Sequence, residues 1–245
     1  MKRTKIIMGM PITVEVVEKV AGSDIESVFA YFRSVDKRYS TYKASSEISK
    51  INAGLLRNKW SREMKAVLEL CEQTKELTNG YFDISHDGKL DPSGLVKGWA
   101  INNAANLLLD KGVKNFYIEA GGDIQAHGTN ADNQPWAVGL RNPFNIEEII
   151  KVIRLTTEGV ATSGAYIRGQ HIYNPHNNHR EAGFVKSLTV IGPNVYEADR
   201  YATAAFAMGQ DGIAFIESTP GLEGYVVDAN KLATYTSGFE RYVKA

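Results

Sequence analysis

Cysteine is almost absent from this 245-residue sequence, because Cys71 is the only one. A single cysteine excludes an intrachain disulfide framework and a metal centre built from several thiolates. Cys71 falls in the polar helical pattern KAVLELCEQTKEL, where we expect an ordinary helix residue. Stability must therefore come from a packed core, which a chain of this length can build.

The sequence also lacks an excess of one charge and long apolar runs. Its 28 Lys and Arg balance its 28 Asp and Glu, so no general positive field attracts nucleic acid or anionic lipid, and we expect no nucleic-acid partner. No stretch approaches the roughly 18–20 apolar residues of a membrane span. Gly9 and Pro11 interrupt the first apolar run, which leaves no signal-peptide core. We expect a soluble, cytoplasmic chain, or a cell-envelope location if a leader precedes the given sequence.

Regular structure is predicted in groups of helices and strands. Helices are expected from Ser23 through about Tyr39, with Ser23 and Glu26 as a capping box, from Ser61 to Leu77, and in LDPSGLVKGWAINNAANLLLDKG. A strand is expected near the N-terminus, and further strand-like segments are NFYIEA, DIQAHG, PWAVGLR, KVIRLTT, VKSLTVIG, GYVVDA and LATYTS. The helical patterns EADRYATAAFAMG and DGIAFIES interrupt these strands. This grouping favours an α+β class with antiparallel sheet, organised as one domain over residues 1–245.

Two glycine- or hydroxyl-rich segments of the first half are ambiguous by themselves. YSTYKASSEISKIN, ending at Asn52, is either a polar loop or part of a binding site. In LDPSGLVKGWA, Ser93, Gly94 and Lys97 lie near a helix start, which suits a phosphate because free N–H groups and the helix dipole favour an anion. An Asp-Pro turn before an ordinary helix explains the segment equally well, and the spacing is not that of a Walker A loop.

Two further segments of this kind follow in the second half. In IEAGGDIQAHG, Gly121 and Gly122 indicate either a tight turn between strands or backbone exposed to a flat ligand. The spacing does not match the dinucleotide-binding fingerprint. GVATSGAYIRGQHIYNPHN combines a Thr-Ser-Gly cluster with Arg168 and His171, and this histidine is as compatible with a structural hydrogen bond as with a chemical role.

The segment EADRYATAAFAMG places Asp199 and Thr203 four residues apart, on one face of a helix rich in alanine. Mg²⁺ takes oxygen ligands, often one or two carboxylates together with phosphates and water. The pair could supply part of such a shell. It could equally be an acid favoured by the helix dipole and a threonine bonding its own i−4 carbonyl.

Read in order, these segments resemble the ApbE family of FAD:protein FMN transferases. The resemblance is carried by MGMPITVEV, SSEISKIN, LDPSGLVKGWAINNAANLL, EAGGDIQAHG with PWAVGLRNP, GVATSGAYIRGQHIYNP and SLTVIGPNVYEADRYATAAFAMG. Together they run from about residue 8 to 209. The resemblance implies a T-fold-like α+β protein, with antiparallel sheets, packed helices and a cleft between two halves that binds FAD.

Site residues follow from the resemblance position by position. It implies a Mg²⁺ ion held by Asp199, Thr203 and the backbone carbonyl of Val96, with Asp199 and His171 in catalytic roles and His171 assisting proton transfer. The positions matching segments that line the flavin cleft are Met8, Gly9, Ser46, Asn52, Lys97, Gly121, Gly122, Asp123, Thr162, Ser163 and Gly164.

The implied reaction is transfer of the FMN half of FAD to a Thr or Ser hydroxyl of an acceptor flavoprotein, with release of AMP. Water as the acceptor would make the same site an FAD pyrophosphatase, and loss of turnover would leave an FAD-binding protein. The sequence departs from the family pattern at HIYNPHNN, where Asn174 replaces an acid and Asn178 a glycine. The family's lipoprotein signal and lipidated cysteine do not occur in the given sequence.

Overall fold

The computed structural model describes residues 1–164, 173–176 and 184–243. Within them, eight strands form one sheet in the order β1-β2-β5-β6-β9-β10-β11-β12, and each neighbouring pair is antiparallel. The bounds are β1 Lys2–Ile7, β2 Met10–Val16, β5 Phe116–Ala120, β6 Asp123–His127, β9 Gly159–Gly164, β10 Val185–Gly192, β11 Glu223–Asp228 and β12 Ala233–Tyr235.

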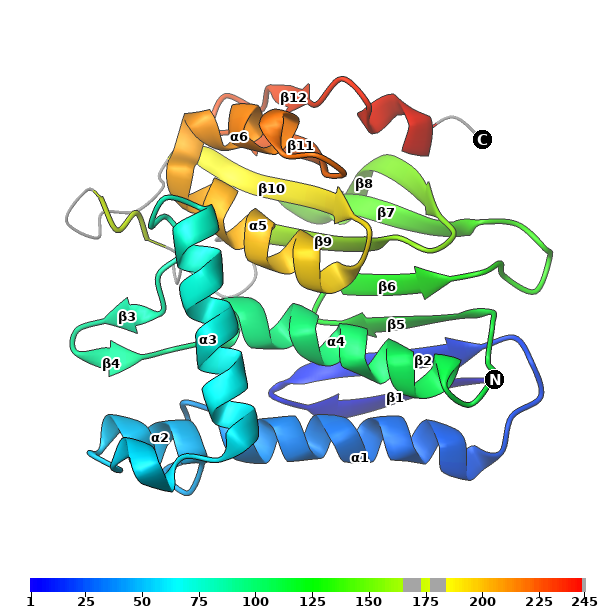
Figure 1. Cartoon of the computed structure of the whole chain (residues 1–245). Coiled ribbons are helices and arrows are strands. Elements are labelled where there is room, and N and C mark those ends of the chain that lie inside the picture. Colours follow the sequence, from blue (N-terminus) through cyan, green and yellow to red (C-terminus); the bar gives the residue numbers. More distant parts are fainter. Residues whose placement is uncertain (165–172, 177–183, 244–245) are drawn as a thin grey trace.

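One face of this sheet is covered by helices (Figure 1). Helices α4 (Ser93–Leu109) and α5 (Val195–Met208) lie across it and pack against each other, and α1 (Gly22–Tyr39) packs on β1 and α4. The remaining helices are α2 (Glu47–Asn52), α3 (Arg62–Leu77) and α6 (Gly212–Ser218), with 3₁₀ turns η1 (Arg57–Lys59), η2 (Gly209–Asp211) and η3 (Phe239–Tyr242). No helix among the described residues is long and apolar enough to cross a membrane.

The opposite face of the sheet carries a hairpin of β7 (Trp136–Asn142) and β8 (Asn145–Leu155). Strand residues alternate between the two faces, and so Leu188 and Val190 pack with α5 while Val160 and Ile191 pack with the hairpin. A second, short hairpin joins β3 (Ser85–His86) to β4 (Lys89–Leu90). The hairpin covers only part of the sheet face, and this leaves room for a cleft beside β7.

The fold confirms the predicted α+β class with antiparallel sheet and corrects several local predictions. The N-terminal segment forms two strands instead of one, joined by a turn at Met8 and Gly9, both of which have positive φ. The capping box at Ser23 and Glu26 was wrong: the helix begins at Gly22 without a side-chain cap, and Glu26 instead pairs with Lys5 and Arg33.

The second predicted helix begins one residue later than expected, at Arg62, and Ser61 is its N-cap, whose hydroxyl accepts a hydrogen bond from the Met64 amide. The 39–52 segment is not all loop, because its last six residues form α2. Strand β9 was not predicted, since glycine and hydroxyl residues hid its strand pattern.

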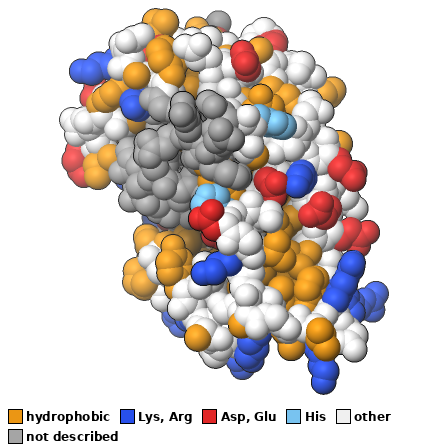
Figure 2. Space-filling view, turned by 90° about the vertical axis from the view of Figure 1, so that its left-hand side faces the viewer, with side chains coloured by type: hydrophobic (Ala, Val, Ile, Leu, Met, Phe, Trp, Pro, Cys, Tyr) orange, Lys and Arg blue, Asp and Glu red, His pale blue; other side chains and the backbone are white. Residues whose placement is uncertain are grey.

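Charge and apolar surface are mixed on the exterior. On the face shown in Figure 2, apolar side chains form a patch with acidic and basic side chains at its borders. Such mixing accords with the balanced charge of the sequence.

Candidate active site

The site is built on the contact between α4 and α5, which two glycines make unusually close. A Cβ added at Gly98 would lie 2.6 Å from Cβ of Asp199 and 2.7 Å from the Val195 carbonyl oxygen. One turn earlier, a Cβ at Gly94 would lie 3.1 Å from Cγ2 of Thr203. The four-residue spacing of the glycines on α4 therefore matches the four-residue spacing of Asp199 and Thr203 on α5.

Both side chains of this pair bond to α4. Oδ2 of Asp199 accepts a hydrogen bond from the Gly98 amide at 2.7 Å, and the Thr203 hydroxyl donates to the Gly94 carbonyl at 3.3 Å. The alternative in which Thr203 bonds the i−4 carbonyl of its own helix is therefore wrong. The pair links two helices that are about one hundred residues apart in the sequence.

Lys97 brings a third segment, strand β6, into the cluster. Its Nζ lies 2.5 Å from Oδ2 of Asp123 and 3.4 Å from Oδ1 of Asp199. All three residues are buried, with 6% of Lys97, 1% of Asp123 and 3% of Asp199 exposed. One cation thus faces two carboxylates in a site withdrawn from water.

Asp123 shows the resulting electrostatic imbalance. Burial raises the pKa of its carboxyl to about 7; the charge of Asp199 adds to this effect, while Lys97 opposes it. Oδ1 accepts a hydrogen bond from the Thr162 amide at 3.2 Å, and Oδ2 is paired with the Lys97 ammonium at 2.5 Å. The cluster favours additional positive charge.

The donor set is compatible with a hard cation. Asp199 and Thr203 supply a carboxylate and a hydroxyl from one helical face, and Asp123 lies next to them through Lys97. Val96, the residue before Lys97, is a buried residue of α4. Among the described residues no group of three or more His, Cys, Asp or Glu forms a metal-binding cluster. Any ion held here would have few protein oxygens as ligands. Mg²⁺ is often bound in this way, with water molecules and substrate phosphates completing its coordination shell.

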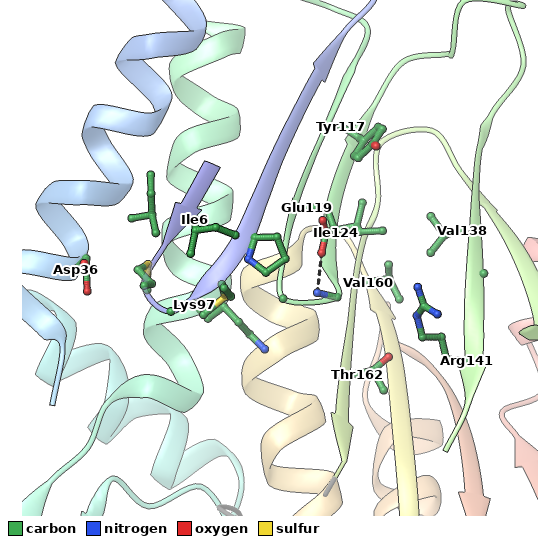
Figure 3. A pocket seen from close by; sticks show the side chains of 18 of the residues that line it. Ile6, Asp36, Lys97, Tyr117, Glu119, Ile124, Val138, Arg141, Val160 and Thr162 are labelled. Carbon is green, nitrogen blue, oxygen red and sulfur yellow. Dashed lines mark hydrogen bonds between the residues drawn. The ribbon is translucent and has the colours of Figure 1, made fainter. Parts of the chain in front are cut away.

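A cleft of about 1260 Å³ opens beside this cluster and reaches Lys97 and Thr162. Figure 3 shows Lys97 in the middle of the cleft, with Ile6 and Asp36 on one side and Val138 and Arg141 on the other. The walls mix apolar and polar groups, as ligand pockets do, and the volume exceeds the usual range of about 300–1,000 Å³ for small-molecule sites. The cleft is large enough for a dinucleotide-sized ligand.

Two glycine turns border the cleft. Gly121 and Gly122 form the turn between β5 and β6, with φ of +60° and +95°, and the Gly122 amide donates to Oε1 of Glu119 at 2.9 Å. Met8 and Gly9 form the turn between β1 and β2. The Gly-Gly pair thus forms a tight turn between strands and also exposes its backbone to the cleft. Both interpretations of this segment, a turn and a ligand-facing backbone, therefore hold together.

The structure brings together part of the predicted site. Met8, Gly9, Lys97, Gly121, Gly122 and Thr162 line the cleft. Asp123, Asp199 and Thr203 lie behind Lys97 and Gly94. Ser163 and Gly164 end strand β9 directly after Thr162. His171 lies outside the described residues.

Ser46 and Asn52 are not among the residues that line the cleft. Ser46 caps α2 by accepting from the Ser49 amide, and it is fully buried. The Asn52 side chain bonds both the amide and the carbonyl of Leu90 at 2.8 and 2.9 Å. Asn52 therefore fixes the strand that precedes α4, an indirect way of positioning Lys97.

The Asn174 departure has a simple structural role. Its Oδ1 accepts a hydrogen bond from the His176 amide at 2.8 Å. The ring of Tyr173 packs on His86 with centroids 4.4 Å apart, and its hydroxyl donates to the Ser85 carbonyl at 3.2 Å. Aspartate would accept the same turn bond, so asparagine preserves the geometry of this segment without its charge.

Sequence reasoning missed two parts of the site. Glu119 was not singled out, although an acid three residues before a Gly-Gly turn can accept from the turn amide. Strand β7 was predicted only as a strand, yet residues 136–141 line the cleft. The available signal was the run WAVGL, five uncharged residues followed by an arginine, which is typical of a strand that lines a binding site.

Comparisons with known proteins show the family to which the chain belongs. The model of the ApbE family matches residues 8–88 and 85–226. A Vibrio cholerae FAD:protein FMN transferase is 30% identical over 139 residues, covering 53% of this chain and 42% of the relative. The Escherichia coli FAD:protein FMN transferase is 26% identical over 162 residues, covering 62% of this chain and 44% of the relative. The matches thus span less than half the length of these relatives.

Solved structures share the fold over the whole chain. The flavin transferase ApbE from Vibrio cholerae superposes with a TM-score of 0.87 at 20% identity, covering 99% of this chain and 98% of that one. The ApbE protein from Thermotoga maritima superposes with a TM-score of 0.86 at 21% identity, covering 100% of this chain and 99% of that one. Because the family model matches nearly the whole sequence and the fold agrees throughout, this chain belongs to the ApbE family.

Proposed function

We propose that this protein transfers the FMN moiety of FAD to a Thr or Ser hydroxyl of an acceptor flavoprotein and releases AMP. The observation that carries the proposal is the buried cluster of Lys97, Asp123 and Asp199 at the inner wall of a large cleft. Relatives named FAD:protein FMN transferase support the reaction class. The proposal treats residues 1–245 as one catalytic domain.

Mg²⁺ fits the oxygen donors of the cluster, and we assign Asp199, Thr203 and the Val96 carbonyl as its protein ligands. When bound, the ion would neutralise charge on the diphosphate and polarise the phosphorus under attack. Lys97 contributes a second positive charge at the same wall. The turns at Gly121–Gly122 and Met8–Gly9 bring backbone close to the bound flavin nucleotide.

The transfer step balances without an oxidant or reductant. The acceptor hydroxyl oxygen forms a bond to the FMN phosphorus, the bond from that phosphorus to the AMP oxygen breaks, and the hydroxyl proton passes to a base. We assign proton transfer to His171 and charge stabilisation to Asp199 with its metal. The protein supplies mainly position and electrostatics, as is usual in phosphoryl transfer.

The test is incubation of the protein with FAD, Mg²⁺ and purified candidate acceptors. Covalent flavin fluorescence on an acceptor band in a denaturing gel, together with AMP, is the expected result. AMP and free FMN without a labelled band would assign an FAD pyrophosphatase instead. FAD binding without AMP release under any divalent metal would assign a binding protein, and chelation with EDTA is the control for metal dependence.

A further inference from the structure

Within the part of the chain that the structure describes, strand β7 is paired along one edge only. Among the described strands it pairs with β8 only, from Trp136 opposite Leu155 to Asn142 opposite Asn145. In an antiparallel pair, every second residue directs its N–H and C=O away from the partner strand. The far edge of β7 therefore presents a row of backbone donors and acceptors that no described strand uses.

This free edge faces the cleft. Six consecutive residues of β7, 136–141, line it. Side chains of a strand point alternately to its two faces, so a cavity that touched one face would meet every second residue. Contact with all six consecutive residues means that the cleft runs along the edge of the strand. In Figure 3, Val138 and Arg141 mark this edge, across the cleft from Lys97 and Ile6.

Between Pro135 and Arg141 the edge lacks the usual protection against pairing. Natural sheets shield exposed edges with charged residues, proline or bulges. Trp136 to Leu140 is uncharged, and the register shifts of the hairpin begin only after Leu140. Ala137 and Gly139 are exposed, and neither carries a side chain larger than a methyl group, while Trp136 and Leu140 are buried and anchor the strand in the core. The edge is therefore anchored by buried side chains and open to another backbone.

We propose that the free edge of β7 binds an extended segment of the acceptor polypeptide as an added β-strand. This inference rests on the proposed transferase function and specifies how that function recognises its substrate. Backbone pairing supplies affinity without demanding a particular sequence, and it directs the segment along a cleft that also reaches Thr162 and Lys97. The volume of about 1260 Å³ exceeds the common range for one small ligand, so the cleft has room for more than the nucleotide.

The experiment uses a pool of synthetic 12-residue peptides, each with one central threonine. The whole protein is incubated with the pool, FAD and Mg²⁺, and the most strongly flavinylated peptide is identified by mass spectrometry. Its Thr→Ala form, which cannot react, is then added to isotope-labelled protein, and amide hydrogen exchange is followed by NMR. Exchange with FAD alone is the control.

The expected result is new protection of every second amide between residues 136 and 141, at least tenfold slower than with FAD alone. The other amides of β7 are already bonded to β8 and stay unchanged. Flavinylated peptides without alternating protection on β7 would overturn the strand-addition proposal and leave the transferase function intact. A pool without any flavinylated peptide would instead overturn the transferase proposal, and this inference with it.

Two proline variants sharpen the result. Ala137 and Val138 are adjacent, so one directs its N–H to β8 and the other to the cleft. Proline removes the N–H at its position. One of the variants Ala137→Pro and Val138→Pro therefore loses a hydrogen bond to β8, and the other loses only the donor that faces the cleft. The second is recognised by a melting temperature closer to that of the wild type. We expect that variant to bind the unreactive peptide at least tenfold more weakly, and unchanged affinity would contradict strand addition.

Discussion

Asp199 and Arg200 are consecutive buried residues of α5, yet they belong to two different charge clusters. Arg200 faces α3: its guanidinium donates to Oε2 of Glu197 through Nε at 3.0 Å and Nη2 at 2.6 Å, and to the Thr74 hydroxyl at 3.1 Å. It also lies over the rings of Tyr196 and Tyr201, 4.8 and 4.9 Å from their centroids. One cation meets one anion, a hydroxyl and two aromatic rings.

Asp199 faces α4, and its cluster is not balanced. One ammonium serves two carboxylates, at 2.5 Å from Oδ2 of Asp123 and 3.4 Å from Oδ1 of Asp199. Two buried carboxylates that share one cation leave an excess of negative charge away from water, which is unfavourable. A further cation or a ligand at this site would relieve it. The comparison separates a cluster that holds helices together from one suited to chemistry.

The largest effect is expected for Asp199→Asn, which removes the negative charge but keeps the size of the side chain. We expect AMP release from FAD to fall by about 10²–10³, the scale for loss of one electrostatic stabiliser. Steady-state AMP release by chromatography measures it. Glu197→Gln in the other cluster is the matched control, and equal losses in both variants would erase the distinction between the clusters.

Arg200→Met should act on stability instead. Removing the guanidinium leaves Glu197 without its partner, and we expect the free energy of unfolding to drop by about 2–3 kcal/mol. This is less than the cost of about 3–5 kcal/mol for breaking a fully buried ion pair, because Glu197 is partly exposed. Urea denaturation measures the drop. AMP release per folded molecule should match that of the wild type; a loss comparable to that of Asp199→Asn would place Arg200 in the catalytic site.

Added Mg²⁺ should stabilise only through the unbalanced cluster. At 100 times its dissociation constant the ion contributes about 2.7 kcal/mol, which corresponds to a rise in melting temperature of about 5–10 °C for a domain of this size. Differential scanning calorimetry with and without MgCl₂ measures this shift. Arg200→Met should show the same shift as the wild type and Asp199→Asn none; a shift retained by Asp199→Asn would place the ion elsewhere.

The smallest effect is expected for glycine substitutions between the helices. Gly98→Ala places a methyl group against Cβ of Asp199 and a backbone carbonyl, and we expect a loss of about 1–3 kcal/mol from overpacking. Gly94→Ala, whose methyl would meet only side chains at 3.1 Å or more, should cost less. Urea midpoints of the two variants test this order, and a more destabilised Gly94→Ala would contradict the close contact at Gly98.

Local sequence patterns predicted the elements better than the site. The helix capped by Ser61 and most strands of the sheet followed from periodicity and capping. Strand β9 did not, because GVATSG is poor in strand-forming apolar residues and is held between β6 and β10 by long-range pairing. The capping box at Ser23 failed because Glu26 found tertiary partners in Lys5 and Arg33.

The sequence by itself determined the face on which Asp199 and Thr203 lie, since helical spacing fixes it. It also determined the helix start near Lys97 and the turn at Gly121–Gly122. Only the tertiary structure decided what these groups meet: Gly94 and Gly98 let α4 approach α5, and β6 brings Asp123 to Lys97. Contacts between residues far apart in the chain depend on packing, which no local pattern encodes. For the same reason the sequence did not predict that one edge of β7 lies along the cleft.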